Sequence, residues 1–398
     1  MKITGVIVEY NPFHNGHQYH LQKARELTGA DFIVAIMSGD FVQRGTPAVT
    51  DKYTRAHMAL LNGADVVYEL PSVYATASAE TFAYGAVSHL NALENIDFLC
   101  FGCESLDFSL MNNVAKILVE EPEEYRVLLR KKLAEGFSYP IARKTSLLPL
   151  LPDYPQKELL SFLESSNNIL GIEYMKALYR MHSSIKPFLL KREGALYQAE
   201  ELPFTSFFPS ATALRKTYRE TSSLADFQNY VPQNVLSLLA ESENRCFPMD
   251  IDDFSDLLYY KLQFSSLEDL LTYADITPDL AKRIFNKKNE FKLISTFSYL
   301  IKTKQNTFTR IQRVLLHILL NIKKEVPLPS YLRLLGFRKS ATKIIDSSLS
   351  AVPIITKVAD YPDLLKQDLA CTNLYNYMVY KKFNYTIAND FIHPLVIL

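Results

Sequence analysis

The chain has 398 residues, of which 48% are hydrophobic and 22% are charged, so it can bury a sizeable core and is not a disordered chain. No apolar run reaches the roughly 18 residues that a membrane span requires, and four cysteines are too few for a disulfide framework. The early run "ITGVIV" lacks the order of a signal peptide, and the length favours two domains, so we expect a cytoplasmic two-domain protein.

Short apolar segments alternate with amphipathic ones along the first half of the chain. The apolar segments predict strands at 3–10, 31–39, 64–71, 97–104 and 186–193. The segments between them predict helices at 17–29, 51–63, 78–93 and 109–136, with a further helix at 210–220. Strands separated by helices in this way indicate a parallel sheet buried on both faces, an α/β fold of the Rossmann-like type.

The alternation stops near residue 225, where long amphipathic stretches such as "FTRIQRVLLHILLNIKK" take over. We therefore expect a catalytic α/β domain over residues 1–225 and a mainly α-helical domain over 226–398. Cys100 and Cys103 form a C-x-x-C within a strand-like run, and no second pair completes a zinc site. We interpret both as core residues and expect no metal-binding site.

Basic residues are concentrated in the second half. Between residues 281 and 345 there are 15 basic residues and two acidic ones, a net charge of +13 within a chain that is neutral overall. A surface of this kind attracts phosphate backbones, although a solvated helical face would have a similar composition.

The segment "EYNPFHNGHQYH", residues 9–20, follows the first predicted strand and enters the first predicted helix. Ligands of parallel sheets bind at the carboxyl ends of the strands, and a helix N-terminus attracts anions. Gly16 would let a phosphate approach the backbone, and His14 and His17 could donate to the same phosphate if the turn is helical. Both would stabilise charge during attack on the α-phosphate of ATP without acting as bases. Two surface histidines or a zinc site are the alternatives, and His20 could contact a nucleotide or simply pack.

Several longer motifs occur in a fixed order. They are "VEYNPFHNGH", "MSGDFVQRGTPAV", "DKYTRAHMAL", "GADVVYELP", "NNILGIEYMKAL", "SATALRK", "FTRIQR" and "YLRLLGF". The H-x-G-H alone resembles the nucleotidylyltransferase superfamily. The ordered set, which extends beyond residue 335, closely resembles the bacterial tRNA(Met) cytidine acetate ligase family.

The resemblance implies a two-step reaction. Acetate and ATP, with Mg²⁺, give acetyl-adenylate and pyrophosphate, and the wobble cytidine of elongator tRNA(Met) then takes the acetyl group to give N(4)-acetylcytidine. Acetyl-CoA and a membrane have no part in it. A small-molecule adenylyltransferase similar to the pantetheine-phosphate enzymes, a non-catalytic RNA-binding protein with a relic nucleotide site and an acetyl-CoA-dependent acetylase remain rival interpretations.

The resemblance also implies site residues. His14 and His17 would be catalytic, and one of the two asparagines in "NNILG" would contact ATP. The ATP-binding set would comprise Ile7, Val8, Glu9, Tyr10, Asn11, Pro12, Phe13, His14, Asn15, Gly16, His17, Gln18, Tyr19, His20, Gly102, Asn167, Asn168 and Arg192. Further phosphate contacts would come from Ser210, Thr212, Arg215 and Lys216, although Ser210 could equally cap a helix. The tRNA-binding set would comprise Lys282, Arg283, Lys287, Lys288, Arg310, Arg313, Arg333 and Arg338.

Two further features concern the same site. Gln43 and Arg44, in "FVQRG", form a polar loop that we expect to face the active site. Two positions depart from the family pattern: the run Tyr197, Gln198, Ala199 after the fifth strand, and the acidic Asp40. The resemblance therefore implies no contact to RNA or metal at either position.

Overall fold

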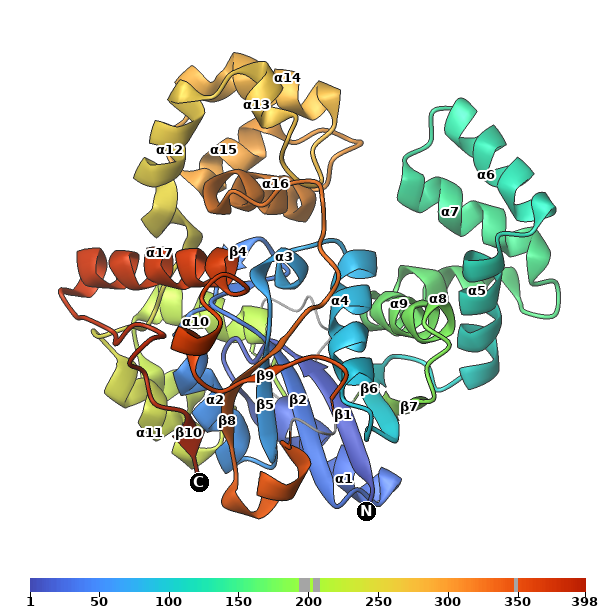
Figure 1. The fold of residues 1–398 in the computed structure, drawn as a ribbon. Coiled ribbons are helices and arrows are strands. Elements are labelled where there is room, and N and C mark those ends of the chain that lie inside the picture. The colour runs from blue at the N-terminus through green and yellow to red at the C-terminus, as the bar shows by residue number, and fades with distance from the viewer. Residues whose placement is uncertain (193–200, 203–207, 347–349) are drawn as a thin grey trace.

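The computed structural model describes residues 1–192, 201–202, 208–346 and 350–398. Five parallel strands form the centre of its main sheet (Figure 1): β1 (Ile3–Val8), β2 (Phe32–Ser38), β5 (Val66–Leu70), β6 (Phe98–Cys103) and β7 (Lys186–Lys191). Their spatial order is β5-β2-β1-β6-β7, so the direction of winding reverses between β1 and β6. The expected α/β class and all five expected strands are confirmed.

Helices cover both faces of this sheet (Figure 1). Those of the first half are α1 (Asn15–Thr28), α2 (Lys52–Leu61), α3 (Ser72–Ala75), α4 (Ala79–Ala92), α5 (Phe108–Glu120), α6 (Glu123–Ala134), α7 (Tyr139–Leu147), α8 (Gln156–Glu164), α9 (Ser166–Arg180) and α10 (Ala211–Thr221). The single helix expected at 109–136 is two helices, α5 and α6. The chain turns at Glu121, which has φ 44°, and at Pro122, which has no N–H to continue the helix.

The second half contains α11 (Gln233–Ser242), α12 (Ser255–Phe264), α13 (Leu267–Leu270), α14 (Pro278–Lys287), α15 (Ile294–Ile301), α16 (Phe308–Leu320) and α17 (Lys366–Phe383). Helices α12–α16, residues 255–320, form a unit that we call the helical lobe (Figure 1). Its apolar core also includes Phe41 of β3 and one side of α17. Within the described part of the chain, no helix is long and apolar enough to cross a membrane.

The chain returns to the sheet after the lobe. β8 (Leu332–Phe337) pairs antiparallel with β5, while β9 (Ile354–Ile355) and β10 (Val396–Ile397) pair parallel with β8. The short strands β3 (Phe41–Val42) and β4 (Thr46–Pro47) form a separate hairpin. A single division near residue 225 therefore does not separate the sheet from the helices. β8 is a single apolar strand that follows about 90 mainly helical residues. The sequence did not predict it, because no alternation of strands and helices surrounds it.

A buried ionic cluster joins the C-terminal segment to the sheet. The Lys52 ammonium lies 3.0 Å from both carboxylate oxygens of Glu69 and 2.7 Å from Asp390, and it donates to the Thr372 hydroxyl at 2.9 Å. Thr372 in turn donates to Asp40 at 2.8 Å. Asp40, one of the two unusual positions, is therefore part of this structural cluster. The other position, Tyr197 to Ala199, lies outside the described residues.

Candidate active site

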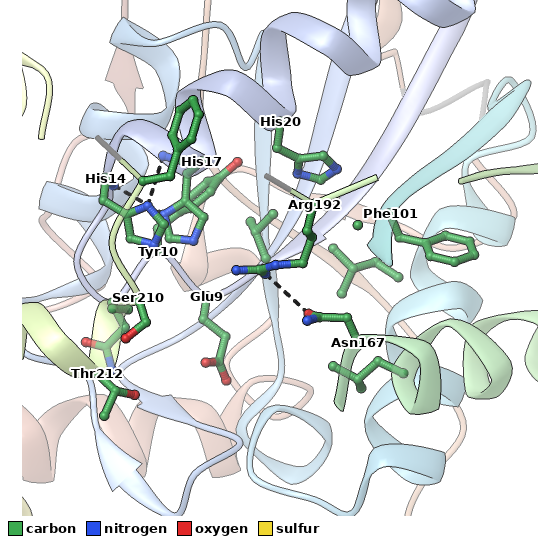
Figure 2. Close-up of a pocket in the computed structure, with 18 of the residues that line it drawn as sticks. Glu9, Tyr10, His14, His17, His20, Phe101, Asn167, Arg192, Ser210 and Thr212 are labelled. Carbon is green, nitrogen blue, oxygen red and sulfur yellow. Dashed lines mark hydrogen bonds between the residues drawn. The ribbon is translucent and has the colours of Figure 1, made fainter. Parts of the chain in front are cut away.

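A cavity opens at the carboxyl ends of β1 and β6, where the winding of the sheet reverses (Figure 2). Its walls come from the end of β1 and the first turns of α1, from β6 and α9, from the strand end at Arg192, and from the start of α10. The loop between β3 and β4 closes another side with Gln43 and Arg44, so the expectation that this loop faces the site is confirmed.

The two histidines of H-x-G-H form a stacked pair at the start of α1. His14 is the N-cap residue of the helix, and its Nδ1 accepts from the Gly16 N–H at 3.1 Å. The His17 Nδ1 accepts from the His14 N–H at 3.3 Å. The rings lie 3.6 Å apart between centroids, with an angle of 21° between planes. Since both Nδ1 atoms accept, each neutral ring carries its proton on Nε2 and keeps a donor for a ligand.

Burial and nearby cations keep these rings neutral. Burial lowers the pKa of His14 to about 3, with further contributions from Arg192 and Arg215. Burial, then His14 and Arg192, holds the pKa of His17 well below its usual value. At neutral pH both side chains are therefore hydrogen-bond donors and not acids. Because each Nδ1 already accepts a hydrogen bond, the ring nitrogen that could take up a proton is occupied in both histidines.

Gly16 also makes room for a neighbouring side chain. A Cβ at this position would lie 3.0 Å from Cε1 and 3.1 Å from Nδ1 of His14. The missing side chain thus makes room for the imidazole that caps the helix, in addition to leaving the backbone open. Gly102 has a similar relation to Arg192, because a Cβ there would lie 3.1 Å from Cγ of the arginine.

Arg192 lies centrally in the cavity, between the histidine pair and α9 (Figure 2). Its Nη1 donates to Asn167 Oδ1 at 3.3 Å, and Asn167 Nδ2 donates to Glu104 at 2.7 Å. Arg215 donates to the Asn11 carbonyl at 2.7 Å and to Thr212 at 3.2 Å. Two guanidinium groups and a helix N-terminus therefore converge on one space, which suits a polyphosphate.

The structure brings most of the expected ATP-binding residues to the cavity. Those that line it are Ile7, Val8, Glu9, Tyr10, Asn11, His14, Gly16, His17, Tyr19, His20, Gly102, Asn167, Arg192, Ser210, Thr212 and Arg215. Ser210 also caps α10, because its Oγ accepts from the Ala213 N–H at 2.9 Å. His20 Nε2 and Gln43 Nε2 are buried and have no hydrogen-bond partner among the residues that the structure describes. Both side chains therefore bring an unsatisfied polar atom to the wall of the cavity.

Six of the expected contacts are not at the cavity: Pro12, Phe13, Asn15, Gln18, Asn168 and Lys216. Phe13 is fully buried in the core beside α1. Helical geometry turns Gln18 away, and its amide donates to Asn62 at 3.0 Å. Asn15 donates to the Asn229 carbonyl at 2.9 Å. The expectation for Asn15 and Gln18 treated residues 7–20 as one continuous contact, whereas only one side of α1 can face a ligand.

The two asparagines of "NNILG" differ in position. Asn168 is 1% exposed, accepts from the Glu104 and Ser105 N–H groups at 3.0 and 3.3 Å, and donates to the Phe162 carbonyl. Its amide is fully used in holding the loop after β6. Asn167 is the one that lines the cavity.

We expect Asn167→Ala to raise the KM for ATP, because this side chain lines the cavity and positions Arg192 there. Its effect on stability should be smaller than that of Asn168→Ala. Asn168→Ala should lower the free energy of unfolding by about 1–3 kcal/mol, because two half-buried N–H groups lose an acceptor that is itself buried. Urea unfolding and ATP titrations of both variants check this. If Asn168→Ala raises the KM for ATP more than Asn167→Ala does, the assignment is wrong.

The apolar wall was not anticipated from the sequence. Phe82, Phe101, Leu170 and Tyr174 line the side of the cavity away from the histidines. Leu170 and Tyr174 follow Asn167 by three and seven residues, so helical spacing from that asparagine would have placed them on the same face. An apolar wall opposite cationic groups is suited to a nucleobase with its phosphates.

The basic residues of the second half fall into two groups. Lys282, Arg283, Lys287 and Lys288 lie on or directly after α14, and Arg310 and Arg313 lie on α16, where both pair with Asp275. Arg333 and Arg338 are not on this surface. Arg333 is 2% exposed within β8, and Arg338 donates to the Leu60 carbonyl at 2.9 Å. Strand pairing accounts for both, because β8 carries them into the main sheet.

A parallel sheet with H-x-G-H at the carboxyl end of its first strand, facing two arginines, defines a nucleotidyl transferase. A family model described as HIGH Nucleotidyl Transferase matches residues 1–390. The tRNA(Met) cytidine acetate ligase of Thermoanaerobacter sp. (strain X514) is 41% identical over the whole of both chains. The Clostridium perfringens (strain ATCC 13124) enzyme of the same name is 39% identical over 95% of this chain and 96% of its own.

Solved structures agree with these relatives. Thermotoga maritima TmcAL superposes with a TM-score of 0.93 at 34% identity, over the whole of both chains. A second crystal form of that protein, bound with alpha-thio ATP, superposes with a TM-score of 0.91. The chain belongs to the tRNA(Met) cytidine acetate ligase family of HIGH nucleotidyl transferases.

Proposed function

We propose that this ligase activates acetate with ATP and transfers the acetyl group to the wobble cytidine of elongator tRNA(Met). An acetate oxygen attacks the α-phosphorus, the bond to the bridging oxygen breaks, and pyrophosphate leaves. The exocyclic amine of cytidine then attacks the acetyl carbon, AMP leaves, and the amine nitrogen loses a proton. The products are N(4)-acetylcytidine, AMP and pyrophosphate, and acetyl-CoA is not consumed.

The stacked pair of neutral imidazoles at the start of α1 is the observation that carries this proposal. Acetate is already an anion at neutral pH, so the first step needs no general base. It needs positioned donors for the negative charge that develops on the phosphorus and on the departing pyrophosphate. The Nε2–H groups of His14 and His17 supply these donors, and Arg192 and Arg215 would hold the phosphates.

ATP would lie with its base against the apolar wall and its phosphates toward α1 and α10. Mg²⁺ would accompany it. Among the described residues, no group of three or more His, Cys, Asp or Glu side chains is placed to hold a metal. The ion would therefore enter on the phosphates, as Mg²⁺ commonly does, and would neutralise part of their charge.

The cations of α14 would hold the tRNA backbone: Lys282 is exposed, and Lys287 is half-buried and pairs with Glu290 at 2.6 Å. We expect the double variant Lys282→Ala, Lys287→Ala to weaken tRNA binding and to reduce the slope of log affinity against log salt by about 1.5. Acetate-dependent exchange between pyrophosphate and ATP should not change. The matched control is Lys2→Ala, Lys186→Ala, at the amino ends of β1 and β7, and it should bind as the wild type does. Equal slopes for both double variants would contradict this assignment.

The rival interpretations explain less of the chain. A small-molecule adenylyltransferase has no use for the helical lobe, and a relic site would not be expected to keep both imidazoles with their donors turned to the cavity. An acetyl-CoA-dependent enzyme leaves the nucleotide cavity without a function. The proposed reaction uses the helical lobe, the pair of imidazoles and the nucleotide cavity. Its tRNA substrate implies a cytoplasmic location.

Labelled acetate, ATP and bulk tRNA test the proposal. The expected result is label in N(4)-acetylcytidine of a methionine tRNA, with no acetyl-CoA present, and formation of one AMP for each acetyl group transferred. Label that appears only when acetyl-CoA is supplied would overturn it.

A further inference from the structure

Helices α6 and α7 form a hairpin that projects from the body of the protein (Figure 1). Of residues 121–141, only Tyr125 is buried, whereas nearly all the others are exposed. We call this hairpin the arm, and its turn with the flanking residues 130–139 the arm tip. A Cβ added to Gly136 in the turn would meet no atom within 4 Å. The tip is therefore not packed against the rest of the chain.

The arm tip combines cations with aromatic rings. Arg130 and Lys131 are exposed and form no ion pair with any residue that the structure describes. Lys132 lies 5.3 Å above the ring of Phe137, which is 43% exposed, and Tyr139 is 52% exposed. From residue 121 to residue 146 the chain has six basic and four acidic residues. Four of the basic side chains pair with carboxylates, so the positive charge open to a ligand is that of Arg130 and Lys131 at the tip. Aromatic platforms beside cations are the surfaces that bind unpaired nucleotides.

The arm is fixed to the helix that lines the cavity. Arg143 of α7 pairs at 2.7 Å with Glu173 of α9, which is 2% exposed. The same helix presents Asn167, Leu170 and Tyr174 to the cavity. The arm and the helical lobe rise on opposite sides of the cavity end of the sheet, and the arm tip lies on the side that faces the lobe (Figure 1).

We propose that the arm tip is a second RNA-binding surface, which holds the anticodon arm of the tRNA from the side opposite the helical lobe. Arg130 and Lys131 contact the phosphate backbone, and Phe137 and Tyr139 stack on unpaired loop bases. A nucleotide between the two surfaces then has access to the cavity. This inference rests on the proposed function, since it assumes that the substrate is a tRNA.

A second copy of the chain is the competing occupant, because Val127, Leu133 and Ile141 are also exposed on the arm. Charge argues against it. A two-fold contact places the same patch on both subunits, so a contact centred on the arm tip would bring Arg130 and Lys131 of one copy close to the same cations of the other. A polyanion matches this charge.

The test uses the full-length protein and two pairs of substitutions. Arg130→Ala with Lys131→Ala should weaken tRNA binding about ten-fold at moderate salt and reduce the salt slope by about 1.5. Phe137→Ala with Tyr139→Ala should weaken binding by a similar factor and leave the slope unchanged, because stacking releases no counterions. The control is again Lys2→Ala with Lys186→Ala. Thermal unfolding should show that all variants are folded.

The outcomes separate this inference from the proposed function. Acetate-dependent exchange between pyrophosphate and ATP should be the same in the arm variants as in the wild type. If that exchange is intact and both arm variants bind tRNA as the wild type does, the arm proposal is wrong. A shift of the arm variants from dimer to monomer in sedimentation, with unchanged tRNA affinity, would assign the arm to a second copy instead. If the wild type shows no acetate-dependent exchange between pyrophosphate and ATP, the proposed function itself is wrong.

Discussion

Replacing His14 or His17 by alanine is expected to lower acetate-dependent exchange between pyrophosphate and ATP by about 100- to 1,000-fold. Each change removes one neutral Nε2–H donor that meets charge in the transition state, and losing one such donor typically has an effect of this size. Affinity for tRNA should remain nearly unchanged, because the histidines lie inside the cavity and not on the basic surfaces. Exchange rates and tRNA titrations on the same preparations check both parts.

The cap function of His14 requires a control. His14 Nδ1 accepts from the Gly16 N–H, so alanine also removes a helix cap, which typically stabilises by about 0.5–2 kcal/mol. Asparagine is a good N-cap residue and lacks the Nε2–H, so His14→Asn should restore stability without restoring exchange. His182→Ala, on a turn outside the cavity, is the matched histidine control. Recovery of exchange in His14→Asn would show that the ring acts only as a cap.

Lys52→Met should destabilise the fold by about 3–5 kcal/mol, because it leaves buried carboxylates without a counter-ion. Burial alone would lower the pKa of Lys52, but Glu69, Asp390 and Asp40 raise it well above its usual value, so the ammonium is charged at neutral pH. The pKa of Lys52 is higher in the folded than in the unfolded protein. The stabilisation is therefore complete at any pH below the pKa of lysine in the unfolded protein, and it is lost only as the pH rises through the pKa of Lys52 in the folded protein. Urea unfolding at pH 7 measures the loss.

Two comparisons make this prediction specific. Lys23→Met removes a lysine from an exposed pair with Glu26 on α1, and it should change the free energy of unfolding by less than about 1 kcal/mol. The difference between Lys52→Met and wild type should also shrink on acidification, because burial already raises the pKa of Glu69 to about 7 and a proton can replace the missing charge. A difference that is constant from pH 7 to pH 5 would contradict the account.

The central architecture could be predicted because its signals are local. Each of the five parallel strands is a short apolar run between helices, and H-x-G-H lies directly after the first of them. Once the sheet is parallel, the carboxyl end of β1 must carry the site. The stacking of His14 on His17 also follows from local geometry, because the residues are three apart where the helix begins.

The parts that could not be predicted depend on contacts between distant segments. β8 lies about 260 residues after β5 in the chain, and no local pattern indicates that the two strands pair. This pairing explains why Arg333 is buried despite its place among basic residues. The choice between Asn167 and Asn168 depends on which amide accepts from the backbone N–H groups of Glu104 and Ser105. The arm was not predicted from the sequence because it has far fewer cations than the helical lobe.

The central claim is that neutral donors at the start of α1 hold ATP while a carboxylate displaces pyrophosphate. Acetate labelled with ¹⁸O in both oxygens tests this claim most directly. After acetylation of tRNA, the account predicts one ¹⁸O atom in the phosphate of AMP and none in pyrophosphate, with label transfer slowed in His14→Asn and His17→Ala. Label in inorganic phosphate or pyrophosphate, or unlabelled AMP, would show that the acetate oxygen never attacks the α-phosphorus.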